Sequence, residues 1–207
     1  QDEHGRYIDP KFYTPKSDAA IVQPGDIIYE DVNGDKVIDD KDKVVLGDQD
    51  PHYIFSFKAS AQWKMFDLSF YLQGVGRWNG YLSDEARHCF INDYSIPKIE
   101  HLDRWTPTNP NATYPRLYMA ETHNRMFSDY WIENASYLRM KNIQAGFTFP
   151  KKWLKGIGIK NLRCYVSADN LFTVTQYFGA YDPELHASSG DAYPQVKTFI
   201  FGVQTTF

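Results

Sequence analysis

The sequence ends on residues 198–207, which read TFIFGVQTTF, and this segment is the most informative about the fold. Its odd-numbered positions are apolar apart from one threonine: Phe199, Phe201, Val203, Thr205 and Phe207. Its even-numbered positions are small or polar, with Ile200 as the exception. Because successive side chains of a strand point to opposite faces, this alternation predicts a strand with one aromatic face. A strand that reaches the last residue suits a closed membrane barrel, in which the last strand pairs with the first.

The same two-faced pattern recurs at residues 53–63, 66–73, 143–149 and 160–175. Only Lys64 and Met65 separate the first two segments, which predicts an antiparallel hairpin. The apolar parity slips between residues 138 and 143, which predicts a β-bulge or a membrane boundary there. Lys58 and Asp67 lie on the second face, which suits a water-filled lumen better than a dry core, because unpaired buried charge is costly.

The composition favours strands over helices as the membrane-crossing element. The 207 residues include 15 Tyr, 14 Phe and 5 Trp, yet the mean hydropathy is only −0.52. A transmembrane helix needs about 20 consecutive apolar residues, and no such run occurs, whereas a transmembrane strand needs about 9–11 residues, half of them apolar. The net charge of −4 speaks against a nucleic-acid partner.

Turn residues divide the chain into four regions. Residues 1–50 are a polar loop region, and residues 51–78 are the hairpin. Residues 79–135 are long and irregular, which is typical of the extracellular loops of a membrane barrel. Residues 136–207 hold the C-terminal strands. The first residues resemble a cut end, so we expect the chain to be a piece of a longer protein.

Several motifs resemble one family. They are GDIIYEDVNGD at 25–35, FDLSFYLQG at 66–74, SYLRMKNI at 136–143, residues 162–171, YDPE at 181–184 and the terminal Phe207. In this order they resemble the C-terminal portion of SusC/RagA-type TonB-dependent outer-membrane transporters. The match covers most of residues 25–207.

This resemblance implies an all-β fold, in which antiparallel strands form the C-terminal part of a 22-stranded transmembrane β-barrel. It implies the outer membrane of a Gram-negative bacterium as the location and import of oligosaccharides or peptides as the function. It also implies a SusD-type lid lipoprotein as partner, and contact with the TonB complex through a missing N-terminal part. Phe207 would be the aromatic terminus that the barrel-assembly machinery reads.

An acidic loop follows the first motif and has the spacing of an EF-hand. Such loops surround Ca²⁺ with oxygen ligands at positions 1, 3, 5, 7, 9 and 12. Lys36 replaces the glycine of the sharp turn, so an acidic surface turn without an ion is the alternative. The candidate ligands of a structural Ca²⁺ are Asp31, Asn33, Asp35, the Val37 carbonyl, Asp39 and Asp42.

Loop aromatics are weak candidates for substrate binding, because their faces can stack on sugar rings. Trp78, Tyr81 and Trp105 are the ones we single out, with an interfacial girdle or loop packing as the alternative. The histidines are scattered, and Ser188 lacks the strand–turn–helix context of a nucleophile. We therefore expect no catalytic residue and no enzyme.

Two rival classes remain open. One is a secreted β-sandwich that binds carbohydrate and carries a structural calcium loop; the other is a purely structural adhesin domain. The aromatic face separates them from a barrel, because it meets lipid in a barrel and a second sheet in a sandwich.

Overall fold

A computed structural model describes residues 24–35, 38–91, 95–117, 119, 123–177, 181–185, 187–188, 193 and 195–207. The chain forms two compact units. The loop unit comprises Gln1–Gly47, Tyr81–Ile132 and Ala187–Asp191, and the sheet unit comprises Asp48–Gly80, Glu133–His186 and Ala192–Phe207. Of the polar region predicted at residues 1–50, residues 1–23 lie outside the described part.

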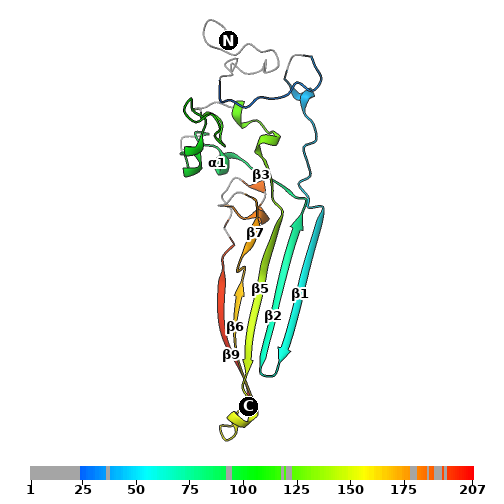
Figure 1. The fold of residues 1–207 in the computed structure, drawn as a ribbon, viewed down its shortest axis with the longest axis vertical. Coiled ribbons are helices and arrows are strands. Elements are labelled where there is room, and N and C mark those ends of the chain that lie inside the picture. The colour runs from blue at the N-terminus through cyan, green and yellow to red at the C-terminus, as the bar shows by residue number, and fades with distance from the viewer. Residues whose placement is uncertain are drawn as a thin grey trace. The chain divides into compact units, whose positions relative to one another are not determined.

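The sheet unit is an antiparallel sheet with the strand order β1-β2-β5-β6-β9 (Figure 1). Its strands are β1 (Tyr53–Trp63), β2 (Phe66–Gly76), β5 (Tyr137–Thr148), β6 (Asn161–Asp169) and β9 (Thr198–Thr206). A short strand β7 (Thr173–Thr175) also pairs with β5. The predicted hairpin is confirmed: β1 and β2 pair from Tyr53 opposite Gly76 to Trp63 opposite Phe66.

The parity slip predicted upstream of Ile143 is a β-bulge. Tyr71 faces Asn142, but the next residue, Leu72, faces Met140. Lys141 is therefore the extra residue on β5, and the faces of β5 exchange parity on either side of it. The extra residue explains why the apolar side chains of β5 are even-numbered before the bulge and odd-numbered after it.

Cross-strand register gives the sheet one apolar and one polar face. Residues directly opposite each other share a face, and one apolar row runs Ala61, Leu68, Ala145, Val166 and Phe201. The next position on each strand belongs to the polar face, where one row runs Ser60, Ser69, Gln144, Ser167 and Ile200. The apolar side chains are exposed, with Phe201 81% and Phe199 63% accessible. No second sheet covers them in the described part of the chain.

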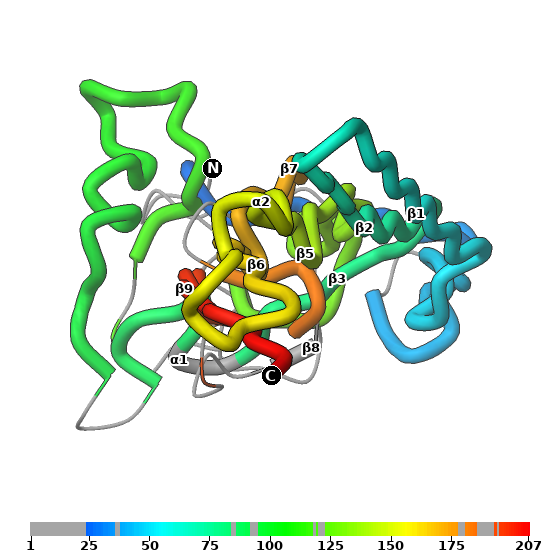
Figure 2. The backbone as a smooth tube through the Cα atoms, turned by 90° about the horizontal axis from the view of Figure 1, so that it is seen from below, coloured from blue at the N-terminus to red at the C-terminus, as the bar shows by residue number. Residues whose placement is uncertain are grey.

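The described strands do not close into a barrel. Strands β1 and β9 are the two edges of the sheet, so each has one edge that no described strand pairs with. The helix α2 (Lys151–Leu154) joins β5 to β6 and lies nearest the viewer in Figure 2. Close to it, Lys160 donates its backbone N–H to Thr206 O at 2.7 Å, which fixes the end of β9.

The loop unit has little regular structure and a small aromatic core. Its elements are η2 (Asp40–Asp42), α1 (Asp84–Arg87), η3 (Ile99–Asp103), η4 (His123–Arg125), η5 (Asp129–Trp131) and β8 (Ala187–Ser188). The chain passes between the units within β3 (Asn79–Leu82) and at β4 (Ile132–Asn134). A further turn, η6 (Pro183–Leu185), belongs to the sheet unit.

Trp131 is the centre of the loop unit, with 1% of its surface exposed. Its Nε1 donates to Asn124 O at 2.9 Å, and the Arg87 guanidinium lies 4.5 Å from its ring centroid.

No helix in the described part of the chain is long and apolar enough to cross a membrane.

Candidate functional site

The polar face of the sheet carries an ion pair that spans three strands. Arg163 on β6 donates to both carboxylate oxygens of Asp67 on β2, at 3.0 Å from Nε and 2.5 Å from Nη2. Gly146 on β5 lies beneath the pair, where a Cβ atom would collide with both side chains. The glycine therefore leaves room for the two charged groups to meet above the central strand, and a larger side chain there would displace them.

A second, more buried charge network lies on the same face at the bulge. Arg139 is 2% exposed, and its Nη2 donates to Asp182 Oδ1 at 2.6 Å while its Nη1 lies 3.1 Å from Glu184 Oε1. Lys141, the bulge residue, reaches Glu184 at 2.5 Å. Tyr137 donates its hydroxyl to the same carboxylate at 3.0 Å. Two cations and two anions thus hold the turn η6 against β5 with no net charge.

Sequence reasoning missed this network, in which Asp182 and Glu184 of the YDPE motif take part. The signal was present as Arg139 and Lys141 at alternate positions of an otherwise uncharged strand. The sequence does not show that Arg139 and Asp182, which are 43 residues apart, lie next to each other in the fold. Geometry therefore identifies the partners where spacing does not.

The three candidate aromatics occupy different environments. Trp78 is 8% exposed, and its Nε1 donates to Gln49 O at 2.6 Å. Tyr81 packs against Phe127 in a tilted arrangement, with 4.6 Å between ring centroids. Trp105 covers Gly25, whose φ of +93° and lack of a Cβ allow the ring to sit against the backbone. These contacts favour a packing role, most clearly for Trp78, and their role in substrate binding stays a prediction.

The motif around Gly25 docks onto the second half of the loop unit. Ile27 donates its N–H to Asn124 Oδ1 at 2.8 Å, and His123 Nε2 contacts Ile27 O at 2.9 Å. The Asn124 amide also donates to Asp26 Oδ1 at 3.0 Å. These contacts connect residues almost 100 positions apart, so the motif fastens two loop segments together.

The predicted calcium loop is a hydrogen-bonded turn in the structure. Asp31 Oδ1 accepts from the Gly34 N–H at 2.7 Å, and Asp42 accepts from the N–H groups of Val32 and Asp39 at 2.9 and 2.7 Å. The bond from Asp39 contributes most to holding the pKa of Asp42 below its usual range. The loop carboxylates are thus satisfied by amides of the loop itself.

A metal centre is not assembled in this geometry. Within the described residues, no three or more His, Cys, Asp or Glu side chains come together in a way that could hold a metal. Asn33 Oδ1 accepts from the Asp35 N–H at 2.8 Å, and Lys41 Nζ lies 3.6 Å from Asp35. Val37, the predicted carbonyl ligand, lies outside the described residues. The oxygen donors suit Ca²⁺ chemically, but they would have to exchange amide partners for the ion.

Comparison with known proteins finds similarity to TonB-dependent receptors. No family model matches it. It is 30% identical over 199 residues to TonB-dependent receptor P3 of Formosa agariphila, which covers 89% of this chain and 19% of that receptor. It is 28% identical to TonB-dependent receptor SusC of Bacteroides thetaiotaomicron over 89% of this chain and 18% of SusC. The chain spans about a fifth of the length of these curated relatives.

Solved structures give the same result. The structure of the RagAB peptide transporter matches with a TM-score of 0.67 and 25% identity, over 83% of this chain and 19% of that chain. The RagAB peptide importer in the "open-open" state matches with a TM-score of 0.63 and 26% identity. The match confirms a mostly antiparallel β fold that aligns to part of the RagA structure.

The family resemblance seen in the sequence is therefore confirmed as homology. TonB-dependent receptors lie in the outer membrane of Gram-negative bacteria, which is the location that the sequence predicted. The TonB-dependent transporter family is not enzymatic, in agreement with the prediction that this protein is not an enzyme.

Proposed function

From the homology of this chain to SusC/RagA-type TonB-dependent receptors, we propose that it forms the C-terminal part of a 22-stranded transmembrane barrel. The whole barrel would import oligosaccharides or peptides across the outer membrane. The observation that carries this proposal is the exposed apolar face of the sheet. Leaving Phe199, Phe201 and Val203 63–81% exposed is unfavourable in water, whereas lipid accepts them without cost.

The polar face supports the same assignment. It carries Lys58, Asp67, Gln144 and Arg163, and the ion pair between Asp67 and Arg163 is only partly exposed. Transmembrane barrels alternate apolar side chains outside with polar ones inside. We assign this face to the lumen, where the turn η6 lies over it.

Energy and lid function would come from other polypeptide segments. The TonB complex would act on the part of the protein that precedes this chain, and a SusD-type lipoprotein would cover the extracellular loops. The homologous RagAB structures are described as a peptide importer in open and closed states, which favours a two-component machine with moving parts. The loop unit would belong to the extracellular side.

Brominated lipids provide the test that separates a barrel from a secreted β-sandwich. Trp63 is 67% exposed at the end of the apolar face. When the full-length protein is reconstituted in brominated phospholipid, we expect the lipid to quench part of the tryptophan fluorescence. The substitution Trp63→Phe should make this quenched part smaller. Trp78→Phe is the matched control, because Trp78 is buried. If Trp63→Phe leaves the quenched fraction unchanged, the lipid-facing assignment is wrong and the sandwich is favoured.

We further propose that the loop at residues 31–42 binds a structural Ca²⁺ that replaces its internal hydrogen bonds. Calorimetric titration of the full-length protein should show heat on addition of millimolar Ca²⁺, and Asp31→Ala should abolish it. Asp40→Ala is a suitable control, since Asp40 is not at a ligand position and pairs with Lys43. No heat with the wild-type protein would leave the loop as a surface turn.

A further inference from the structure

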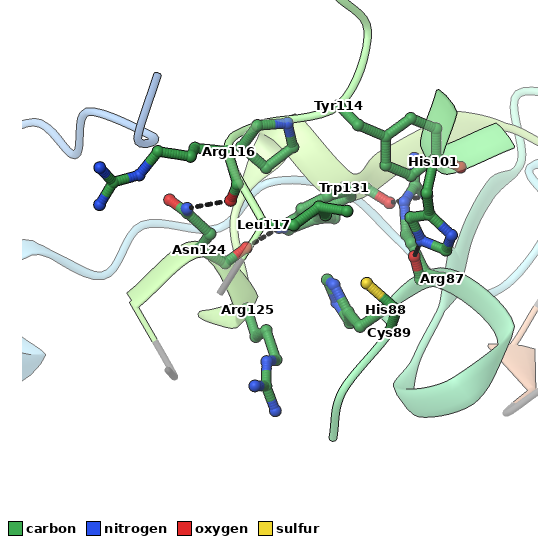
Figure 3. A pocket seen from close by; sticks show the side chains of 11 residues that line it. Arg87, His88, Cys89, His101, Tyr114, Arg116, Leu117, Asn124, Arg125 and Trp131 are labelled. Carbon is green, nitrogen blue, oxygen red and sulfur yellow. Dashed lines mark hydrogen bonds between the residues drawn. The ribbon is translucent and has the colours of Figure 1, made fainter. Parts of the chain in front are cut away.

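The loop unit contains a small cavity beside Trp131 that the transport function does not account for. It is lined by His88, Cys89, Trp131 and three arginines, Arg87, Arg116 and Arg125, among other residues (Figure 3). Its interior volume is about 30 Å³, which is room for about two water molecules. A cavity of this size excludes a sugar ring but accepts a halide ion or a carboxylate group.

His88 presents an unused hydrogen-bonding atom in this region. Its ring stands edge-on to Trp131, with centroids 4.7 Å apart, and its Nε2 is buried without a partner among the described residues. Burial, followed by the charges of Arg125 and Arg87, lowers the pKa of His88 to about 4. The ring is therefore neutral at pH 7, so Nε2 can carry a hydrogen and act as a donor. Burying a donor without an acceptor is costly, which makes an acceptor in the cavity favourable.

In the described part of the chain, the charged side chains that line the cavity are all arginines, and none of the described lining residues carries a carboxylate. Arg87 donates to Trp131 O at 3.0 Å, and Arg116 lies 3.7 Å from the buried carboxylate of Asp26. Arg125 reaches only a carbonyl, Phe90 O at 3.4 Å, and no carboxylate of the described residues forms an ion pair with it. His88 and Arg125 both line the cavity, and the positive charge of Arg125 acts on the His88 ring, so the open donor shares the cavity with the uncompensated charge.

We propose that this cavity binds one small anion, of the size of a halide ion or a carboxylate group. The Nε2–H of His88 donates to the anion, and Arg125 supplies the positive potential that attracts it. Low dielectric around the partly buried site strengthens both interactions. The anion comes either from solution or, if the proposed peptide import holds, from the terminal carboxylate of the cargo.

The site is tested first with free ions on the full-length protein. Crystals grown in sodium bromide should show an anomalous peak within hydrogen-bonding distance of His88 Nε2. In solution, acetate should raise the melting temperature saturably, whereas its neutral isostere acetamide should not. The ionic strength is held constant with 4-toluenesulfonate, whose charged sulfonate group is bulkier than a carboxylate group.

Two variants separate this site from non-specific salt effects. His88→Phe keeps an aromatic ring against Trp131 but removes the donor, and Arg125→Gln removes the charge. Each should weaken the apparent acetate affinity by about tenfold or more, the amount expected for a hydrogen bond to a charged group. His52→Phe and Arg77→Gln, both in the sheet unit, are the matched controls and should respond like wild type. An equal response of all variants, or a bromide peak elsewhere only, overturns the site.

A third measurement identifies the source of the anion. A peptide with a free C-terminal carboxylate should compete with acetate, and its C-terminally amidated form should not. Equal behaviour of the two peptides assigns the cavity to a free ion and overturns the cargo source. Because the bromide and acetate experiments involve no transport, failure of peptide import would leave their outcome intact.

Discussion

Replacing Arg139 by methionine should release the turn η6 from the polar face of the sheet. Arg139 is 2% exposed and bridges Asp182 and Glu184. Methionine retains much of the length of the side chain, so the substitution removes the charge while leaving the space mostly filled. The two carboxylates then lose the cation that lies between them.

The structure sets the size of the effect. Removing one partner of a buried ion pair costs about 3–5 kcal/mol, because a charge remains without compensation. Asp182 keeps one hydrogen bond, from the Glu184 N–H at 2.9 Å, and Glu184 keeps Lys141 and Tyr137. We therefore expect the lower end, about 3 kcal/mol, which corresponds to an opening equilibrium larger by about 100-fold.

Hydrogen exchange measures this opening locally in the full-length protein. The backbone N–H of Leu185 donates to Asp182 O at 2.9 Å, so this amide and that of Glu184 report on the turn. Mass spectrometry of the peptide that contains them should show exchange about 100-fold faster in Arg139→Met. Arg163→Met is the control. It breaks a more exposed pair, which is worth about 0.2–1 kcal/mol when solvent reaches it, and it should leave this peptide unchanged.

If the uncompensated charge of Asp182 opens the turn in Arg139→Met, removing that charge should restore slow exchange. Adding Asp182→Asn to Arg139→Met removes the uncompensated carboxylate, so exchange at Leu185 should return most of the way to the wild-type rate. Exchange that is less than threefold faster in Arg139→Met would contradict the reasoning. It would mean that the turn is held by packing and not by the charges.

Three further predictions concern single positions. Gly202→Val should destabilise the sheet by about 1–3 kcal/mol, because the Tyr165 ring occupies the space of the new side chain. The folding yield, measured by heat-modifiable mobility in gels, should therefore fall. Gly25→Ala should destabilise the loop unit by about 2 kcal/mol and increase its proteolysis, since φ is +93° and Trp105 lies where the methyl would be. Below its ordinary pKa of 6.5, His88 takes up a proton in the unfolded chain but not in the folded one until about pH 4. The loop unit should therefore lose about 1–2 kcal/mol as the pH falls through this range, and His88→Gln should flatten this dependence in a pH series of exchange rates.

Much of the sheet could be predicted from residue alternation. The hairpin at residues 53–76 and the final strand are both legible as period-two patterns, because one face of each meets an apolar environment and the other does not. The bulge at Lys141 is also visible in the sequence, because the inserted residue reverses the odd–even pattern of apolar residues on its N-terminal side.

The loop unit could not be predicted in the same way. Its core forms between segments far apart in sequence, as when Asn124 bonds to Ile27, and irregular backbone has no period to detect. Trp105 looked available for stacking on sugar, but a glycine 80 positions earlier lies against its ring. The cavity beside His88 was likewise invisible, because an isolated histidine in a sequence shows neither its burial nor its neighbours.

The main strands, their two faces and the resemblance to TonB-dependent receptors can be recognised from the amino-acid sequence alone. These follow from local alternation and from motifs, which are properties of neighbouring residues. Which charges meet depends on the three-dimensional fold: Arg139 pairs with Asp182 and Glu184, and Asp67 pairs with Arg163 across Gly146. Pairing across 43 or 96 residues depends on strand register and chain reversal. Electrostatic energy depends on the distance between two charges in space. The positions of two residues in the sequence do not give that distance.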